Sequence, residues 1–329
     1  FGEANTDLSK ETNQVVITGS TSNTIAYGST VDVKALTVAD EATTVKSALK
    51  AAATTIGANQ TGGLTVEDAS NEKLAVVTLG DITVGSTKET ETAAGSFTLT
   101  NNAKNAVEAS SLTVVKNTNA STFTLANGDF SVGKLTNQGN VTLTGGEFSL
   151  TGEGSNASGA KITLADSATA SLVVAEGASL QNQGDIGTAN TQGKIKVSGT
   201  LTNLPKIEAV GGTQAVNAGT ITAAAVEVDG VLSTALDTTT YNVTTTTINT
   251  AGELQTSLNA RLDGAAVADQ KPADALEIAN TITLEGKITA AGAEVPNYIV
   301  NASTGAFTIK EADKTFNTVQ VKAGEFKTD

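Results

Sequence analysis

The 329-residue sequence has no cysteine, histidine, methionine or tryptophan, and its one arginine is Arg261. Without His or Cys there is no Ser-His-Asp or Cys-His catalytic apparatus, no disulfide, and no zinc, haem or iron–sulfur site with the usual ligands. Carboxylates, Lys, Tyr and hydroxyl groups remain, and they form no recognisable catalytic constellation. We therefore predict that the chain is not an enzyme and that it binds no cofactor, with calcium as the metal to consider.

Positive charge and long apolar runs are also scarce. The formal net charge is -14 and the pI is near 4.5, which argues against nucleic acid and anionic membranes as partners. The richest apolar stretch, ITAAAVEV at 221–228, is far too short to cross a bilayer. The joint absence of Cys and Met, both open to oxidation, favours an exposed, long-lived protein.

What the sequence has in abundance is threonine (55 residues), glycine (32) and asparagine (25). Threonine favours strands, whereas glycine and asparagine favour turns. From about 95 to 248, apolar residues recur two apart with a small polar residue between them, which predicts short strands with one buried face. The pairs include Phe97 and Leu99, Phe123 and Leu125, Phe130 and Val132, Val141 and Leu143, Phe148 and Leu150, and Leu172 and Val174.

The short strands suit a solenoid. Three of them would make one coil of roughly two dozen residues, a repeat length typical of solenoids. LTNQG at 135–139 returns as LQNQG at 180–184, and LTN returns 21 positions later at 201–203, a step that suits one coil. We therefore expect an all-β fold with a parallel β-helix (solenoid)-like centre. Tandem β-sandwich domains are the alternative, because short alternating strands suit both architectures.

Phrases such as GNVTLTGG, GTLTN and NAGTITA occur between about 130 and 235. In these phrases the chain resembles the passenger regions of bacterial autotransporters and filamentous-haemagglutinin-like adhesins. The resemblance covers under half of the chain and rests on composition. It implies a β-solenoid displayed on a bacterial or archaeal cell surface.

Three regions are expected: an N-terminal β module over 1–94, the repetitive region over 95–248, and a C-terminal helix plus β module over 249–329. The N-terminal module is expected to contain one amphipathic helix over about 40–57. Its apolar residues stand at helical spacing, Asp40 is placed as an N-cap and Gly57 as the stop. The stripe consists of Val45, Leu49, Ala52 and Ile56.

Two further helices are expected after 248. Thr250 and Glu253 are spaced as a capping box ahead of Leu254, Leu258 and Leu262. KPADALEIAN offers a second short helical turn, with Pro272 in its first turn. The remaining tail, to residue 329, is predicted to form hairpin-like strands.

Carboxylates gather in VEDASNE, as Glu67, Asp68 and Glu72, and again at Glu89 and Glu91. Oxygen ligands at such spacing could hold calcium, but neither an EF-hand loop nor a nonapeptide calcium repeat is present. A solvated acidic loop is the simpler interpretation. The tract DTTTYNVTTTTINT at 237–250 could carry O-linked glycans or form a strand with its hydroxyls in solvent, so surface glycans are a further possible partner.

The function predicted is that of a structural subunit in an extracellular filament or surface layer, with copies of itself as the partner. Subunits would join by strand addition at the chain ends. The chain opens on Phe1 with no signal-peptide pattern, so we expect a secreted product whose leader has been cleaved. A monomeric adhesin passenger is the alternative, and a glycan-active β-helix enzyme is a third. The residues expected at subunit contacts are Phe1, Leu8, Phe316, Val319, Val321 and Phe326.

Overall fold

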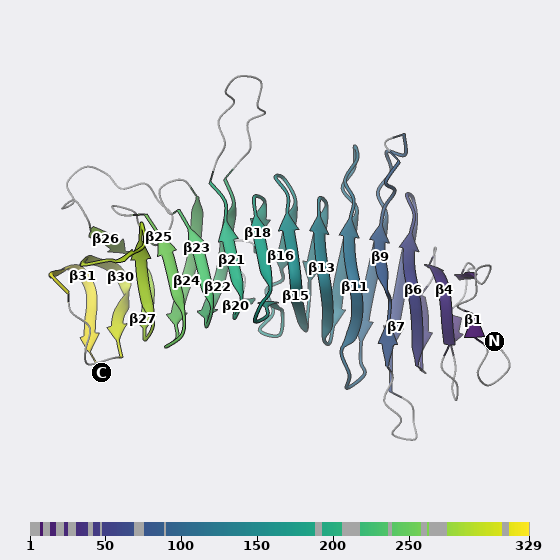
Figure 1. Cartoon of the computed structure of the whole chain (residues 1–329), viewed down its shortest axis with the longest axis horizontal. Coiled ribbons are helices and arrows are strands. Elements are labelled where there is room, and N and C mark those ends of the chain that lie inside the picture. Colours follow the sequence, from purple (N-terminus) through teal and green to yellow (C-terminus); the bar gives the residue numbers. More distant parts are fainter. Residues whose placement is uncertain are drawn as a thin grey trace. The chain divides into compact units, whose positions relative to one another are not determined.

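The computed structural model describes residues 7–8, 14–17, 23–25, 31–38, 42–46, 48–68, 76–88, 90–187, 193–205, 218–235, 239–257, 262, 275–310 and 316–328. Within them the chain is all-β, with 31 strands and no helix (Figure 1). The prediction of an all-β fold is therefore confirmed. The described part of the chain also contains no helix capable of crossing a membrane.

The first fifteen strands are β1 Asp7–Leu8, β2 Gln14–Ile17, β3 Asn23–Ile25, β4 Val31–Val38, β5 Ala42–Val45, β6 Leu49–Ile56, β7 Thr61–Val66, β8 Val77–Thr78, β9 Asp81–Val84, β10 Ser96–Asn101, β11 Val107–Val114, β12 Thr122–Asn127, β13 Phe130–Asn137, β14 Asn140–Leu143 and β15 Glu147–Asn156. The others are β16 Lys161–Leu164, β17 Ser171–Val174, β18 Ser179–Asn182, β19 Asp185–Ile186, β20 Lys194–Val197, β21 Thr200–Asn203, β22 Thr220–Val228, β23 Val231–Thr234, β24 Thr240–Ile248, β25 Glu253–Thr256, β26 Ala275–Ile278, β27 Thr281–Leu284, β28 Lys287–Ala290, β29 Ala293–Glu294, β30 Asn297–Ile309 and β31 Thr318–Thr328.

The chain forms two compact units. Unit 1 comprises Phe1–Gly154, Ala160–Thr163 and Thr169–Ser171, and unit 2 comprises Ser155–Gly159, Leu164–Ala168 and Leu172–Asp329. We describe each unit by itself. The three-region division at 94 and 248 stays a prediction.

Parallel pairing in register organises unit 1. β10 lies between β7 and β12, so that Leu99 is opposite Leu64 on one side and Leu125 on the other. Like residues thus stack on like residues, and the alternate side chains point inward to a buried core. Longer strands restart their alternation after a two-residue break. β11 shows this by burying Val107, Ala109, Leu112 and Val114.

Four phenylalanines form the centre of the core of unit 1. Phe97, Phe123, Phe130 and Phe148 are all fully buried. Phe123 touches the other three, with ring centroids 5.8, 5.2 and 6.3 Å away. The rings are tilted or edge-on, the arrangements that aromatic quadrupoles favour.

Unit 2 uses the same parallel pairing but stacks buried asparagines. β18 pairs in register with β21, placing Leu180 opposite Leu201 and Asn182 opposite Asn203. The 21-residue step between LQN and LTN, which suits one coil, thus separates two strands that pair in parallel and in register. The asparagine side chains are buried and hydrogen-bonded to one another along the stack.

The helix predicted over about 40–57 is wrong. The segment forms β5 and β6, and β6 pairs in parallel with β4 and β9. Leu49 and Ile56 are buried as expected, but Ala52 is exposed, whereas Ala51 and Thr54 are buried. Because the alternation of this strand restarts after two residues, positions 49 and 56 are both buried. They are seven residues apart, which is also the length of two helical turns. The alanine-rich composition gave a weak helical preference that the neighbouring strands override.

The helices predicted after 248 are also wrong in the described residues. Leu254 lies in strand β25, in register between Leu232 and Ile288. Residues 275–278 form β26, a strand in which all four side chains are buried. Leu262 is buried, and Leu258 and Pro272 lie outside the described residues. The apparent helical spacing arose because Leu254, which lies in a strand, and Leu262, a separate buried residue, stand at a distance that a helix would also give.

The tail is mostly parallel, which corrects the prediction of hairpins for β30 and β31. β31 pairs in parallel with β30, and β30 pairs in parallel with β26 and β27. Within the tail, β28 and β29 form an antiparallel pair whose turn is Ala291–Gly292. Alternating apolar residues predict a strand but not the direction of its neighbour. The sequence pattern therefore could not distinguish parallel from antiparallel pairing.

Candidate self-association surface

The feature of unit 2 best suited to binding a partner is strand β31. Nine of its eleven residues pair with residues of β30, with two shifts of register, and no other strand in the described residues pairs with it. Figure 1 shows β31 (yellow) beside β30 at the end of this sheet. A strand with one free edge presents a row of unpaired backbone N–H and C=O groups, to which another strand can add.

Four of the predicted contact residues come together here. Val319 lies opposite Tyr298, Val321 opposite Val300, and Phe326 opposite Phe307. The rings of Phe307 and Phe326 have centroids 5.8 Å apart, and those of Tyr298 and Phe316 are 5.4 Å apart. Val300 and Phe307 beneath are fully buried, whereas Val321 is 48% exposed. The inward-facing side chains of β30 are therefore covered by β31. The side chains of β31 that lie opposite them are not covered by a further strand among the described residues.

Burial affects the chemistry of one group in this row. Desolvation raises the pKa of Tyr298 far above its usual value, and the nearby Glu294 carboxylate adds to the shift. The phenol therefore stays neutral at any physiological pH, so it acts as an apolar platform with a polar tip.

The remaining predicted contacts lie at the other end of the chain. Leu8 is in β1, opposite Val33 of β4, and Phe1 lies outside the described residues. β1 and β2 each pair with β4, and β3 pairs with β5; none of the three pairs with a second described strand. Unit 1 thus also has a sheet edge that is open among the described residues.

The charges on β31 restrict what can add to it. Lys327 Nζ lies 2.6 Å from Glu325, and this hydrogen bond and the lysine charge hold the pKa of the carboxyl below its usual value. The register shifts between Val300 and Ala306 of β30, so β31 follows a bend. A bend and lysines on an edge are common defences against unselective pairing. A strand that adds to β31 has to follow the same bend.

The carboxylates considered for calcium do not converge. Glu67 lies 3.1 Å from Lys46 Nζ, and Asp68 accepts a hydrogen bond of 3.0 Å from the backbone N–H of Lys104. Glu72 and Glu89 lie outside the described residues. No group of three or more acidic side chains is close enough to hold a metal within the described part of the chain.

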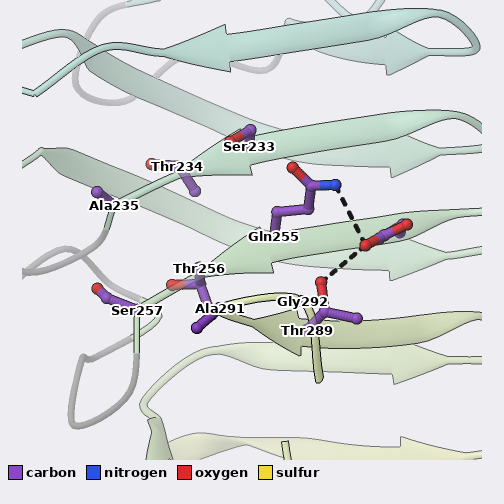
Figure 2. A pocket seen from close by; sticks show the side chains of 10 residues that line it. Ser233, Thr234, Ala235, Gln255, Thr256, Ser257, Thr289, Ala291 and Gly292 are labelled. Carbon is purple, nitrogen blue, oxygen red and sulfur yellow. Dashed lines mark hydrogen bonds between the residues drawn. The ribbon is translucent and has the colours of Figure 1, made fainter. Parts of the chain in front are cut away.

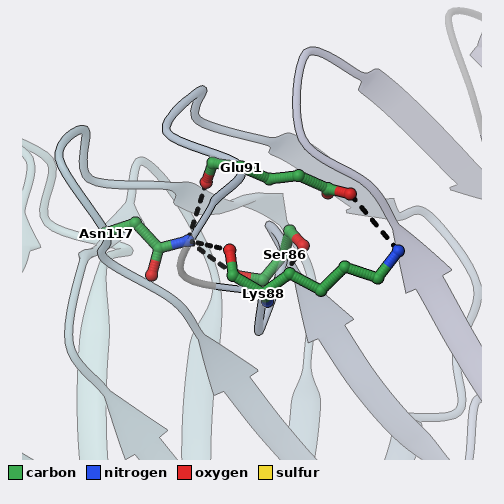
Figure 3. A network of polar contacts seen from close by, with 4 residues as sticks. All are labelled: Ser86, Lys88, Glu91 and Asn117. Atoms are coloured by element: carbon green, nitrogen blue, oxygen red, sulfur yellow. Dashed lines mark hydrogen bonds and ion pairs between the residues drawn. The ribbon is translucent and has the colours of Figure 1, made fainter.

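Glu91, the last of these acids, belongs to a loop network (Figure 3). The side-chain amide of Asn117 donates to the carbonyl oxygens of Ser86, Lys88 and Glu91, at 3.0, 3.1 and 2.8 Å. Lys88 Nζ lies 3.4 Å from the Glu91 carboxylate. Hydrogen bonds from Ser86 and Lys88, with the Lys88 charge, lower the pKa of Glu91. The network holds the loop in shape, and its one amide already occupies the point where the carbonyls converge.

Unit 2 has a polar pocket that no sequence pattern predicted (Figure 2). Its volume is about 340 Å³, and its floor is the in-register row Ser233, Gln255 and Thr289 on β23, β25 and β28. Glu253 accepts a hydrogen bond of 2.7 Å from Thr289, and Lys287 Nζ lies 3.0 Å from it. Once the parallel order of these strands is known, the row can be read from the sequence.

The pocket offers little to a glycan-active enzyme. Its one carboxylate is Glu253, whereas glycoside hydrolysis generally uses two. The Thr289 hydroxyl, with Lys287, holds the pKa of Glu253 below its usual value, although burial opposes this. Glu253 is therefore an ionised hydrogen-bond acceptor and a poor general acid.

No family model, curated protein or solved structure matches this chain. Any function must therefore be inferred from the geometry above. The open edge of β31 is the feature that carries most information about a partner.

Proposed function

We propose that this chain is a structural subunit of an extracellular, self-assembling polymer, either a filament or a surface layer, built on parallel β-solenoids. Copies of the chain would join through the open edge of β31. The observation that carries the proposal is this eleven-residue strand, which pairs with one strand among the described residues and leaves Val321 exposed.

The pairing pattern supports the solenoid part of the proposal. Each of β10, β11, β22 and β24 has a parallel neighbour earlier and another later in the chain. Hydrogen bonds between successive coils, with like residues stacked, are the expected pattern of a parallel solenoid. Sandwich domains are built from antiparallel sheets, so this pairing favours the solenoid.

The two open edges support the assembly part. The edge of β31 and the edge formed by β1, β2 and β3 are different surfaces of one chain. Contact between two different surfaces is heterologous and, unless the rotation closes a ring, it produces an open polymer. Such contacts would be main-chain hydrogen bonds along whole strands, so they would be slow to reverse.

A lysine at Val321 tests the proposal. In the free chain this side chain is half exposed, so Val321→Lys should leave the fold intact, whereas in a polymer it would bury an unpaired charge. Val76→Lys is the matched control, because Val76 is 56% exposed and belongs to unit 1, outside β31. Electron microscopy and light scattering should show polymers for the unchanged chain and for Val76→Lys, and single particles for Val321→Lys.

A second variant addresses the other edge. Removing residues 1–13 should also prevent polymerisation if this segment adds to β31 of the next copy. Single particles in every sample, including the unchanged chain with and without calcium, would reject the polymer and favour the monomeric adhesin. Polymers of Val321→Lys that match those of the control would exclude β31 as the joint.

A further inference from the structure

Unit 1 carries a regular face of hydroxyl groups, independent of the edges discussed above. It is formed by the outward residues of β5, β7, β10, β12 and β14, which pair in parallel and, apart from one shift after Leu99 between β10 and β12, in register. We call it the hydroxyl face. Its three rows are Thr61, Ser96, Thr122 and Asn140; Gly63, Thr98, Thr124 and Thr142; and Thr44, Thr65 and Thr100.

Over its five strands the hydroxyl face contains no charged residue, and the first charge beside it is Lys161 at the start of the next strand, β16. The chain as a whole has 34 acidic and 20 basic residues, and other outward rows of unit 1 include them, such as the row of Asp81, Ser111 and Lys134. Unit 2 likewise has charged outward rows, such as Lys196, Glu227 and Thr247, beside an uncharged one of Ser233, Gln255 and Thr289. The occupant that suits this face is therefore uncharged.

The face is also held firmly from beneath. The residues that alternate with the threonines, including Phe97, Leu99, Phe123 and Leu125, are fully buried. The threonines themselves are partly exposed. Threonine also has restricted rotamers, so both its hydroxyl and its methyl group are presented in a fixed direction. The face is an ordered array and does not depend on mobile side chains.

The spacing of the array is set by the β-sheet. Neighbouring strands lie about 4.8 Å apart, and alternate residues along a strand are about 6.6 Å apart. These two repeats are close to those of the water oxygens on the prism faces of ice. An ordered array of methyl and hydroxyl groups at this spacing can hold surface water in ice-like positions, whereas a charged group would orient that water differently.

We propose that the hydroxyl face binds ice. The proposal commits to an uncharged, periodic solid, because the face is uncharged and periodic in two directions. A soluble sugar suits it less well, since sugar sites are usually concave and this array contains no aromatic ring. The inference does not rest on the proposed polymer, although a polymer would display many such faces together.

The test is inhibition of ice growth by the full chain, measured as thermal hysteresis and as ice recrystallisation in frozen sucrose solution. Thr124→Lys places a long charged side chain at the centre of the face and should abolish both effects. Thr247→Lys is the matched control, because Thr247 is an outward strand threonine of unit 2 beside Glu227. This control should inhibit ice growth as the unchanged chain does.

Two further measurements keep the proposal falsifiable. Circular dichroism and urea denaturation should show that Thr124→Lys is folded, and Thr124→Val, which keeps the shape and loses the hydroxyl, should retain part of the activity. No thermal hysteresis in the unchanged chain would overturn the proposal. So would equal activity of Thr124→Lys and Thr247→Lys, and dimerisation that Thr124→Lys abolishes without any effect on ice would assign the face to another copy of the chain.

Discussion

Units 1 and 2 share parallel pairing in register, yet they differ in what they stack. Unit 1 has four buried phenylalanines in mutual contact. Unit 2 has a hydrogen-bonded ladder in which Asn156 donates to Asn182, and Asn182 to Asn203, each at 2.8 Å. The ladder continues from Asn203 to Thr234 at 3.3 Å.

The difference shows two ways to fix the register of a parallel stack. Aromatic packing is strong but adjustable, since tilted and edge-on rings are both favourable. A ladder of amides is directional, because each amide has one acceptor oxygen facing one neighbour and a donor facing the other. A slip of one strand would leave buried polar groups without partners, so the ladder of unit 2 specifies register more strictly than the rings of unit 1.

The largest expected effect is loss of the central ring in unit 1. Phe123→Ala removes contacts to Phe97, Phe130 and Phe148 and leaves a cavity, so the free energy of unfolding should fall by about 3–5 kcal/mol. Urea denaturation measures it. Phe123→Leu, which retains most of the volume, is the control and should cost far less. Equal losses for Leu and Ala would mean that the ring contacts themselves, and not the filled volume, stabilise the stack.

Substitutions in the asparagine ladder of unit 2 should behave differently, because the effects of two substitutions in it should be coupled. Asn182→Ala leaves the buried amides of Asn156 and Asn203 each without one partner and should cost about 1–3 kcal/mol per orphaned group. Once Asn182 is gone, Asn203→Ala should cost less than it does alone, so a double-mutant cycle gives a coupling energy. Strict additivity of the two substitutions would show that these residues do not act as a ladder.

Much of the fold could be predicted because the residues concerned obey one local rule. Phe97 and Leu99, or Val141 and Leu143, are buried two apart wherever the alternation is unbroken. The return of LQN as LTN identified neighbouring strands, because stacked positions in a parallel sheet select similar side chains. The strand containing Val319, Val321 and Phe326 was predicted for the same reason.

The failures came where alternation is interrupted. β6 restarts its alternation between Ala51 and Thr54, and this phase shift imitates a helix. Local patterns also carry no information on which strand lies beside which. The Asn203–Thr234 contact, the pocket row of Ser233, Gln255 and Thr289, and the hydroxyl face all depend on that order, so they became visible only in three dimensions.

A smaller effect should be a pH dependence of the free energy of unfolding that arises in unit 2 and not in unit 1. The Thr289 hydroxyl, with Lys287, lowers the pKa of the largely buried Glu253 in unit 2. A lowered folded-state pKa stabilises the fold above the unfolded-state pKa, and this contribution is lost as the pH falls through the lower folded-state value. Thr289→Val should therefore cost about 1 kcal/mol at pH 7 and nothing measurable near pH 2, where the carboxyl is protonated.

Unit 1 supplies the control for this pH dependence. A hydrogen bond from Ser86 lowers the pKa of Glu91, but that side chain is 44% exposed, so solvent screens the effect. Ser86→Ala should leave the pH dependence of unfolding unchanged. Urea denaturation of both variants at pH 7 and at low pH decides the matter, and an equal loss for Thr289→Val at both pH values would show that its hydroxyl acts through packing and not through Glu253.

The smallest effect concerns the ion pair of Lys46 with Glu67 in unit 1. Its two atoms are 3.1 Å apart, but the side chains are 42% and 39% exposed. Solvent screens such a pair, so Lys46→Ala should lower the free energy of unfolding by about 0.5 kcal/mol or less, and 1 M salt should remove the difference. Urea denaturation at low and high salt tests it. A larger loss that persists in salt would mean that the lysine stem stabilises unit 1 by covering apolar surface, which would extend the dependence of unit 1 on apolar packing to its exterior.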